Sequence, residues 1–264
     1  MNKYLQVARN TWEETLTYRF NFLMWRIRTV VILLSIYFLW HSVIPQGSTL
    51  FGYTQNMMLT YILLTSITNA FVTSTRTHEI GDEINRGDLI NYLIKPINYF
   101  LYWFSKDIGD KAMNIVFSIA ELTILFLIIK PPIFIQTDIV FIGLFIASII
   151  FAVMLYFFIN ILLGLIGFWS PEVWAPRFIF TIILGFFAGN YFPLDILPTP
   201  IFRIFEALPF SYLIYFPIKI YLGQIAIFEI FKGFLITTIW TFVFFSAVLF
   251  VWNKGLRVYS AQGR

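Results

Sequence analysis

Side chains able to do acid–base or metal chemistry are scarce in this chain. Two pairs, His78-Glu79 and Asp82-Glu83, lie in one charged segment, and no second carboxylate cluster accompanies them. A metal–diphosphate enzyme needs clustered carboxylates, and acid–base catalysis needs a positioned His–carboxylate pair. With no Cys and one further His, His41, thiol chemistry and a Cys- or His-built metal centre are not expected. We therefore expect no catalytic residue, no metal site and no cofactor bound by this chain.

One carboxylate stands apart, in the middle of an apolar run. Glu121 lies in SIAELTILF, and a charge at that depth of a membrane costs a few kcal/mol, so it should face protein or water. It is a candidate polar residue on a transport path or a proton site. The alternative is a hydrogen-bonded residue that holds helices together, with Asn160 or Asn69 as partner, and this is favoured because polar residues often serve packing.

The elements that must position these residues are membrane helices. Of 264 residues, 59% are hydrophobic, 20% aromatic and 12% charged, whereas soluble domains carry about 25% charged residues. Disordered, collagen-like and disulfide-stapled classes are excluded, and an all-α polytopic membrane protein is predicted. Six stretches are apolar enough to span a bilayer, the first and fifth with extensions back through Phe22 and Trp174. They are residues 29–44, 54–74, 112–129, 139–169, 178–192 and 231–252.

Basic residues sort to one side of this topology. Of the 18 Lys and Arg, 14 precede the first span, follow the last, or lie between spans two and three or four and five. By the positive-inside rule both termini are cytoplasmic, and residues 1–264 form one transmembrane domain. The net charge of +4 then reflects attraction to anionic membrane lipids, and no nucleic-acid partner is expected.

The N-terminal part, residues 1–28, is predicted to hold an amphipathic helix and the start of the first span. Leu5, Ala8, Trp12, Leu16 and Phe20 recur at spacings of three and four, which gives one apolar stripe on a helix. Such a helix lies in the headgroup plane. It either anchors the first span or forms a collar that meets a cytoplasmic partner.

The segment 75–111 between spans two and three is predicted to be a cytoplasmic docking loop. Residues 76–111 hold 5 basic and 6 acidic residues. Apolar residues stand between these charges at helical intervals, which predicts a short apolar edge on a charged helix-turn. Pro96 ends that turn, because proline lacks the N–H that a helix needs.

Two further patterns bear on packing. Gly185 and Gly189 form a G-x-x-x-G spacing in the fifth span, which predicts close helix packing within the chain or in a dimer. The stretch 193–230 contains five Pro yet is too apolar for a free loop. We expect it to re-enter the membrane or lie on its outer surface, as short helices around 201–208 and 218–225 broken by those prolines.

Two motifs resemble those of a known family. The first resembles the pattern E-I-x-x-G-x-L-x-x-Y-L-x-x-P-I and comprises Glu79-Ile80, Ile84, Arg86-Gly87, Leu89, Tyr92-Leu93 and Lys95-Pro96-Ile97. The second resembles L-P-F-x-Y-x-x-Y-F-P and comprises Leu208-Pro209-Phe210, Tyr212, Tyr215-Phe216-Pro217 and Tyr221-Leu222-Gly223. With six spans, the chain is similar to the second-type membrane subunits of ATP-binding-cassette (ABC) exporters, in the subgroup of small six-span permeases.

The resemblance implies a permease subunit of an ATP-driven exporter in a prokaryotic cytoplasmic membrane. A separate cytosolic ABC ATPase would hold ATP and Mg, and a second copy or a sister permease would pair across the first and fifth spans to form the substrate path. The loop 75–111 would carry a coupling helix, whose contact with the ATPase is formed or framed by Glu79, Ile80, Ile84, Gly87, Leu89 and Leu93. The segment 193–230 would cap the outer end of the path, with the motif residues Pro209, Phe210, Tyr212 and Pro217.

Two other functions stay open at this point. A secondary transporter typically shows internal repeats, and none is visible between the two halves. A membrane-embedded lipid-modifying enzyme would need a second carboxylate cluster. The sequence identifies neither the substrate nor whether the dimer consists of two identical or two different permease chains.

Overall fold

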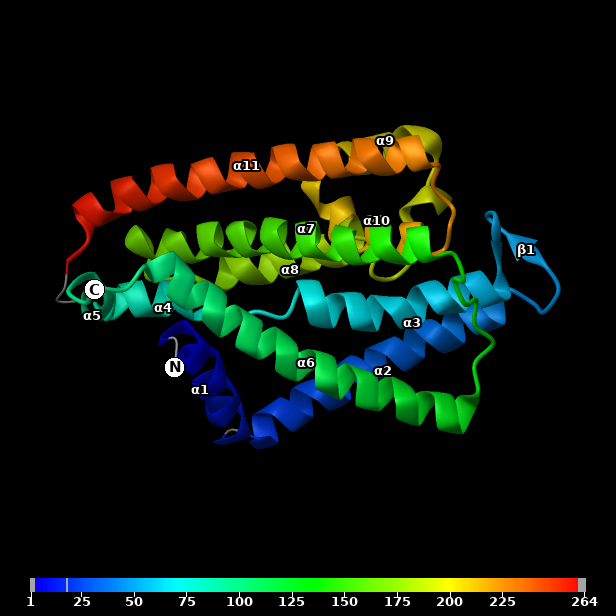
Figure 1. Cartoon of the computed structure of the whole chain (residues 1–264), viewed down its shortest axis with the longest axis horizontal. Helices are drawn as coiled ribbons and strands as arrows, with labels where there is room; N and C mark the ends of the chain where they lie inside the picture. Colours follow the sequence, from blue (N-terminus) through cyan, green and yellow to red (C-terminus); the bar gives the residue numbers. More distant parts are fainter. Residues whose placement is uncertain (1–2, 18, 261–264) are drawn as a thin grey trace.

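The computed structural model describes residues 3–17 and 19–260 and shows a bundle of long helices with two distinct ends (Figure 1). The long helices are α2 (Arg19–Val43), α3 (Gln55–Val72), α6 (Tyr99–Ile129), α7 (Ile139–Gly164), α8 (Trp174–Phe187) and α11 (Ile227–Val258). One end, here called the α4 end, carries α1 (Lys3–Thr17), α4 (Glu79–Asn85) and α5 (Ile90–Leu93). The opposite, hairpin end carries β1 (Thr49–Leu50), β2 (Tyr53–Thr54), η2 (Leu194–Ile196), α9 (Thr199–Ala207), η3 (Pro209–Tyr212) and α10 (Tyr215–Tyr221).

Four helical stretches of the described residues are long and apolar enough to cross a membrane. They are Phe20–Val43, Tyr99–Ile129, Ile139–Phe168 (which continues α7 through η1, Leu165–Phe168) and Ile227–Val258. The extension of the first span backwards is confirmed, because α2 begins at Arg19. α8 is apolar but has 14 residues, about 21 Å at 1.5 Å per residue. The six-span prediction is thus met by four helices, and for α3 and α8 it stays a prediction.

The helix α3 forms the centre of the bundle. Twelve of its 18 residues are buried, and Met58, Leu59 and Ile62 are fully enclosed in the main apolar cluster. It also carries buried Thr and Ser side chains, whose hydroxyls donate to backbone carbonyls of its own helix, as Thr60 and Thr65 do. A helix with partners on all sides can hold polar groups that a lipid-facing helix cannot.

The helix α6 begins 13 residues earlier than the predicted third span, at Tyr99 rather than residue 112. Asn98 caps it by accepting a 3.0 Å hydrogen bond from the Leu101 N–H. The charged residues 106–111, expected in a loop, lie on this first part of α6. They can do so because Lys106 and Asp110 pair with charges from other segments, while Asp107 and Lys111 pair with each other along α6.

The predicted N-terminal helix is present as α1 and packs along α6. At Gly109 the α6 backbone approaches Ala8 so closely that a Cβ would collide with the Ala8 carbonyl oxygen, and the Trp12 indole N–H donates to the Gly109 carbonyl at 2.7 Å. The face against α6 includes buried Thr11 and Thr15 rather than the predicted apolar stripe alone. Leu5 and Leu16 stay exposed at 62% and 55%, which leaves an apolar edge for a membrane surface.

Candidate functional site

The segment between α3 and α6, predicted as a charged helix-turn with an apolar edge, folds as two short helices joined by a glycine turn. Gly87, between α4 and α5, has φ +80°, a left-handed backbone conformation that glycine adopts without strain. Its carbonyl accepts a 2.5 Å hydrogen bond from the hydroxyl of Tyr259, the residue after α11. The end of the last helix therefore holds this turn in place at the α4 end.

Three of the residues expected at a partner contact face the interior of the chain itself. Ile80, Ile84 and Leu89 are 0%, 3% and 0% exposed and pack in a second apolar cluster with Trp103 and Phe168. The expectation that they form a docking surface is therefore corrected. A helical spacing of apolar residues marks a face that is covered, and here the cover comes from α6, α7 and η1 of the same chain. These three residues can only frame a contact.

The backbone of α4 lies directly against the connection between α7 and α8. A Cβ added at Gly167 in η1 would lie 2.7 Å from the Gly81 carbonyl oxygen, and one added at Gly81 would lie 2.6 Å from Val173 Cγ1. Arg177 of α8 donates to the Thr77 carbonyl just before α4 at 2.8 Å. Because the elements touch at backbone distance, α4 cannot move without moving this connection.

The opposite face of the segment is open to partners. Asp82, Arg86 and Asp88 are exposed charges, and Leu93 and Ile94 are exposed at 42% and 72%. Of the expected contact residues, Leu93 thus lies where an approaching protein would meet it. Ile94 was not predicted, because it follows the motif position and falls outside the helical spacing.

Glu79 occupies neither face and instead joins three elements in an ion network. Its carboxylate pairs with Arg76 at 3.0 Å and with Lys106 of α6 at 2.6 Å. Arg76 also pairs with Asp110 of α6 at 3.1 Å and donates to the Thr15 hydroxyl of α1, while Lys106 lies 3.9 Å from Glu14 of α1. We call Glu14, Arg76, Glu79, Lys106 and Asp110 the α4-end network.

The electrostatics of this network favour charged Glu79. Burial alone would raise the pKa of Glu79, but hydrogen bonds and charges from Lys106 and Arg76 outweigh it, and the pKa lies below 4.5. Burial likewise opposes the charge on Arg76, yet Glu79 and Asp110 raise its pKa. Glu79 and Arg76 are therefore favoured in their charged forms, and the ion pairs of the network tie α1, α4 and α6 together.

A polar cavity of about 380 Å³ lies among α2, α3, α6 and α8. Its walls carry hydroxyl and amide groups from each helix, including Ser66, Asn69, Asn114, Ser118 and Thr181. The side chain of Asn69 donates to that of Asn190 at 2.8 Å across it. Such a lining gives water or a polar group partners inside an otherwise apolar bundle.

Two charged residues line this cavity, exposed Arg28 and buried Arg26, and Glu121 supports Arg26 from outside the lining. The Arg26 guanidinium is 4% exposed and binds Glu121 with two hydrogen bonds, the Nε–Oε1 distance being 2.6 Å. It also donates to Ser118 at 3.0 Å and to Asn114 at 3.3 Å. The expected partners of Glu121, Asn160 and Asn69, are therefore corrected to Arg26. Arg26 is counted among the basic residues before the first span, but it falls within the predicted backward extension of that span and lies inside α2.

The two glycines of the G-x-x-x-G spacing do not form one helix face. α8 ends at Phe187, and Gly189 follows it with φ +81°. The Asn190 N–H bonds to the Gly185 carbonyl and the Gly189 N–H to the Phe186 carbonyl, both at 3.3 Å, which is the helix-ending Schellman pattern. Gly189 therefore stops the helix, and it also allows close packing against α3, because a Cβ there would lie 2.7 Å from the Tyr61 hydroxyl. Gly185 packs against the Tyr191 ring.

The motif expected at the outer end folds as the short helices η3 and α10. Pro209 and Pro217 are buried, and the Phe210 ring meets the rings of Phe180 and Phe187 of α8, each with centroids 6.0 Å apart. The Tyr212 hydroxyl donates to the Glu206 carbonyl of α9 at 2.8 Å. The expected short helices are therefore present as α9 and α10, and the motif residues join them to α8.

A second network at this end was not predicted. Lys219 of α10 is 5% exposed and donates to Asp195 at 2.7 Å, to Gln224 at 2.7 Å and to the Tyr53 hydroxyl at 2.9 Å. Tyr53 in turn donates to Asp195 at 2.8 Å. We call these four residues the hairpin-end network. The only sequence signal was a lone Lys within an apolar motif, and its partners lie up to 166 residues away in the chain.

Comparison with known proteins gives one informative result. None of the curated proteins matches the chain significantly. The family model described as "ABC-2 family transporter protein" matches residues 30–263, which covers five of the six predicted spans, most of the other one, and both motifs. This chain belongs to the ABC-2 family of transporter proteins, whose members are membrane components of ABC transporters.

Proposed function

We propose that this chain is the permease subunit of an ATP-driven exporter, and that a separate cytosolic ABC ATPase drives it through the α4–α5 segment. The family membership supports a transport role. The observation that supports coupling is that one side of this segment is exposed while the other is packed against the bundle. Its outer side offers Leu93 and Ile94 beside charged residues, and its inner side is packed into the bundle.

A displacement of this segment would reach several helices at once. The apolar cluster of Ile80, Ile84 and Leu89 contacts α6, α7 and η1, while the α4-end network adds α1. The hydrogen bond from Arg177 of α8 to the Thr77 carbonyl extends the connection to α8. Well-packed interfaces transmit a shift rather than absorb it. An ATPase that moves α5 would therefore move the helices that surround the polar cavity.

The same cavity is the candidate substrate path. It lies against α2 and α8, and both helices carry large exposed apolar side chains, such as Val31 at 56% and Phe186 at 51%. In the proposed dimer these surfaces of two permease copies pair, and Arg26 supplies a fixed positive charge within the path. Glu121 holds Arg26 in position through two hydrogen bonds.

Co-purification with a P-loop ATPase encoded beside this chain tests the coupling. We expect the Leu93→Asp/Ile94→Asp variant to lose ATPase binding, because two charges replace the exposed apolar edge. Phe51→Asp is the matched control, since Phe51 is 57% exposed at the hairpin end and has a positive φ that Asp tolerates. Ile84→Asp is unsuitable, because it would disrupt the core.

Undiminished binding by a well-folded Leu93→Asp/Ile94→Asp variant would contradict the coupling role. Transport by the chain in vesicles without any ATPase would instead identify a secondary transporter.

A further inference from the structure

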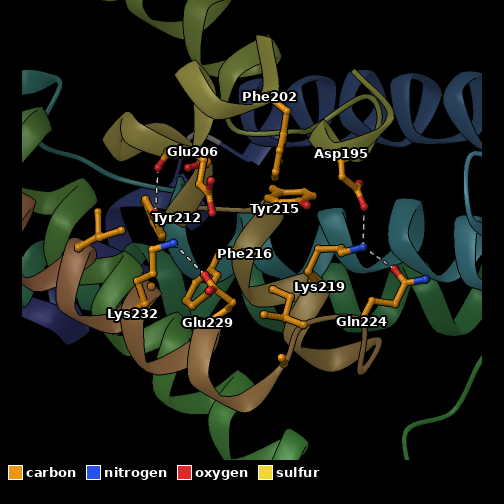
Figure 2. A pocket seen from close by; sticks show the side chains of 15 residues that line it. Asp195, Phe202, Glu206, Tyr212, Tyr215, Phe216, Lys219, Gln224, Glu229 and Lys232 are labelled. Atoms are coloured by element: carbon orange, nitrogen blue, oxygen red, sulfur yellow. Dashed lines mark hydrogen bonds and ion pairs between the residues drawn. The ribbon is translucent and has the colours of Figure 1, made fainter. Parts of the chain in front are cut away.

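The hairpin end contains a second cavity, separate from the polar cavity described above. It measures about 300 Å³ and lies between α9, η3, α10 and the first turns of α11 (Figure 2). A pocket of this size holds a small organic group. Nothing in the proposed coupling mechanism uses it.

Aromatic rings form much of the wall. Phe202 of α9 and Tyr215 of α10 meet edge to face with centroids 5.9 Å apart, and Figure 2 shows the Phe202 side chain pointing toward the Tyr215 ring. Tyr212 and Phe216 form a second edge-to-face pair at 5.3 Å. The faces of such rings carry negative charge density and attract cations.

The charges around these rings leave one carboxylate, Glu206, without a direct ion pair, although its charge helps to raise the pKa of nearby Lys232. Asp195 is paired with Lys219, whose three N–H donors are all used within the chain. Glu229 is paired with Lys232 at 2.9 Å. Within residues 3–17 and 19–260, Glu206 makes no ion pair within 4.0 Å. The lining therefore has three carboxylates and two ammonium groups, a formal charge of −1.

We propose that this cavity binds a quaternary ammonium group, with Glu206 as counter-ion and Phe202, Tyr212 and Tyr215 as the surrounding rings. Aromatic faces around a carboxylate are the chemistry that recognises alkylated ammonium ions, because methyl groups pack on the rings while the charge stays close to the carboxylate. A hydrated metal ion would instead need several oxygen ligands, and aromatic rings do not provide them. The ammonium group comes either from a choline lipid headgroup or from a soluble organic cation. This inference does not depend on the ATPase.

Binding of benzyltrimethylammonium to the purified full-length chain, measured by calorimetry, tests the site. We expect saturable binding that Glu206→Gln weakens about tenfold, because the counter-ion is removed while shape is kept. Phe202→Leu should weaken it several-fold, and its thermal unfolding curve shows whether the fold is intact. Glu13→Gln, an exposed carboxylate on α1, is the matched control and should bind as the unchanged chain does.

Two comparisons complete the test. Equal binding by the Glu206→Gln variant, or equal binding of the uncharged analogue 3,3-dimethylbutanol, would overturn the proposal. Nanodiscs of phosphatidylcholine or phosphatidylglycerol distinguish the source. Weaker binding of the soluble cation in phosphatidylcholine identifies the lipid headgroup as occupant, and equal binding in both identifies a soluble cation. Absence of binding in both would overturn the site.

Discussion

The α4-end network and the hairpin-end network each hold one end of the bundle, but they are built differently. At the α4 end, Arg76 pairs with Glu79 and Asp110, Lys106 pairs with Glu79 and Glu14, and the acidic side chains are partly open to solvent. At the hairpin end one buried ammonium group, Lys219, holds every partner. A network with several cations can exchange partners as helices move. A network with one cation fixes a single geometry.

Removing Lys219 should have the largest effect of the variants that compare the networks. Lys219→Met leaves Asp195 without a counter-charge and should cost about 3 kcal/mol of stability, seen as a lower unfolding temperature. Lys232→Met, at the same end but with its side chain 48% exposed, is the control and should change little. If Lys219→Met unfolds like the unchanged chain, this end is not held by its ammonium group.

A smaller effect is expected from Glu79→Gln at the α4 end. Arg76 keeps Asp110 as partner, and the amide still accepts a hydrogen bond, so we expect a loss of about 1.5 kcal/mol in thermal unfolding. Transport and ATPase stimulation should fall more than stability does, since α4 loses its charged link to α6. If transport and ATPase stimulation fall only as far as the loss of folded protein explains, Glu79 acts only through stability. Glu13→Gln, in an exposed pair, serves as control.

The smallest expected effect is the pH dependence of stability. Each network should affect stability in its own pH range. The pKa of Glu79 is held below 4.5, so its contribution is present above pH 4.5 and is lost as pH falls through the folded-state pKa. Burial lowers the pKa of Lys219 below 10.5, with Asp195 opposing part of this. The folded state then binds fewer protons, so stability rises with pH between the folded-state pKa and 10.5.

Unfolding temperatures measured across pH check both windows. Glu79→Gln should flatten the acid side of the curve, and Lys219→Met should remove the rise on the alkaline side. If Glu79→Gln changed only the alkaline side, or Lys219→Met only the acid side, another group would be responsible for that pH dependence.

The local elements of this fold were largely predictable, and the pairings between them were not. The α4–α5 turn and the short helices α9 and α10 follow from glycine, proline and apolar spacing, which act within a few residues. Arg26 and Glu121 are 95 residues apart. Taken singly, each is a charge near or within an apolar run, where its insertion into the membrane costs free energy. Opposite charges inside two predicted spans were the available signal for this pair. No comparable signal distinguished the covered face of Ile80 and Ile84 from a docking face.

The helix α6 begins at the α4 end and extends toward the opposite end of the bundle (Figure 1). Its 31 residues from Tyr99 to Ile129 run without a break, which gives about 46 Å at 1.5 Å per residue. The ion pairs of Lys106 and Asp110 lie in its first half, and Lys130 in a left-handed conformation stops the helix at its C-terminal end. If the proposed ATPase moves the α4 end, this continuous helix would carry the displacement far beyond the contact itself.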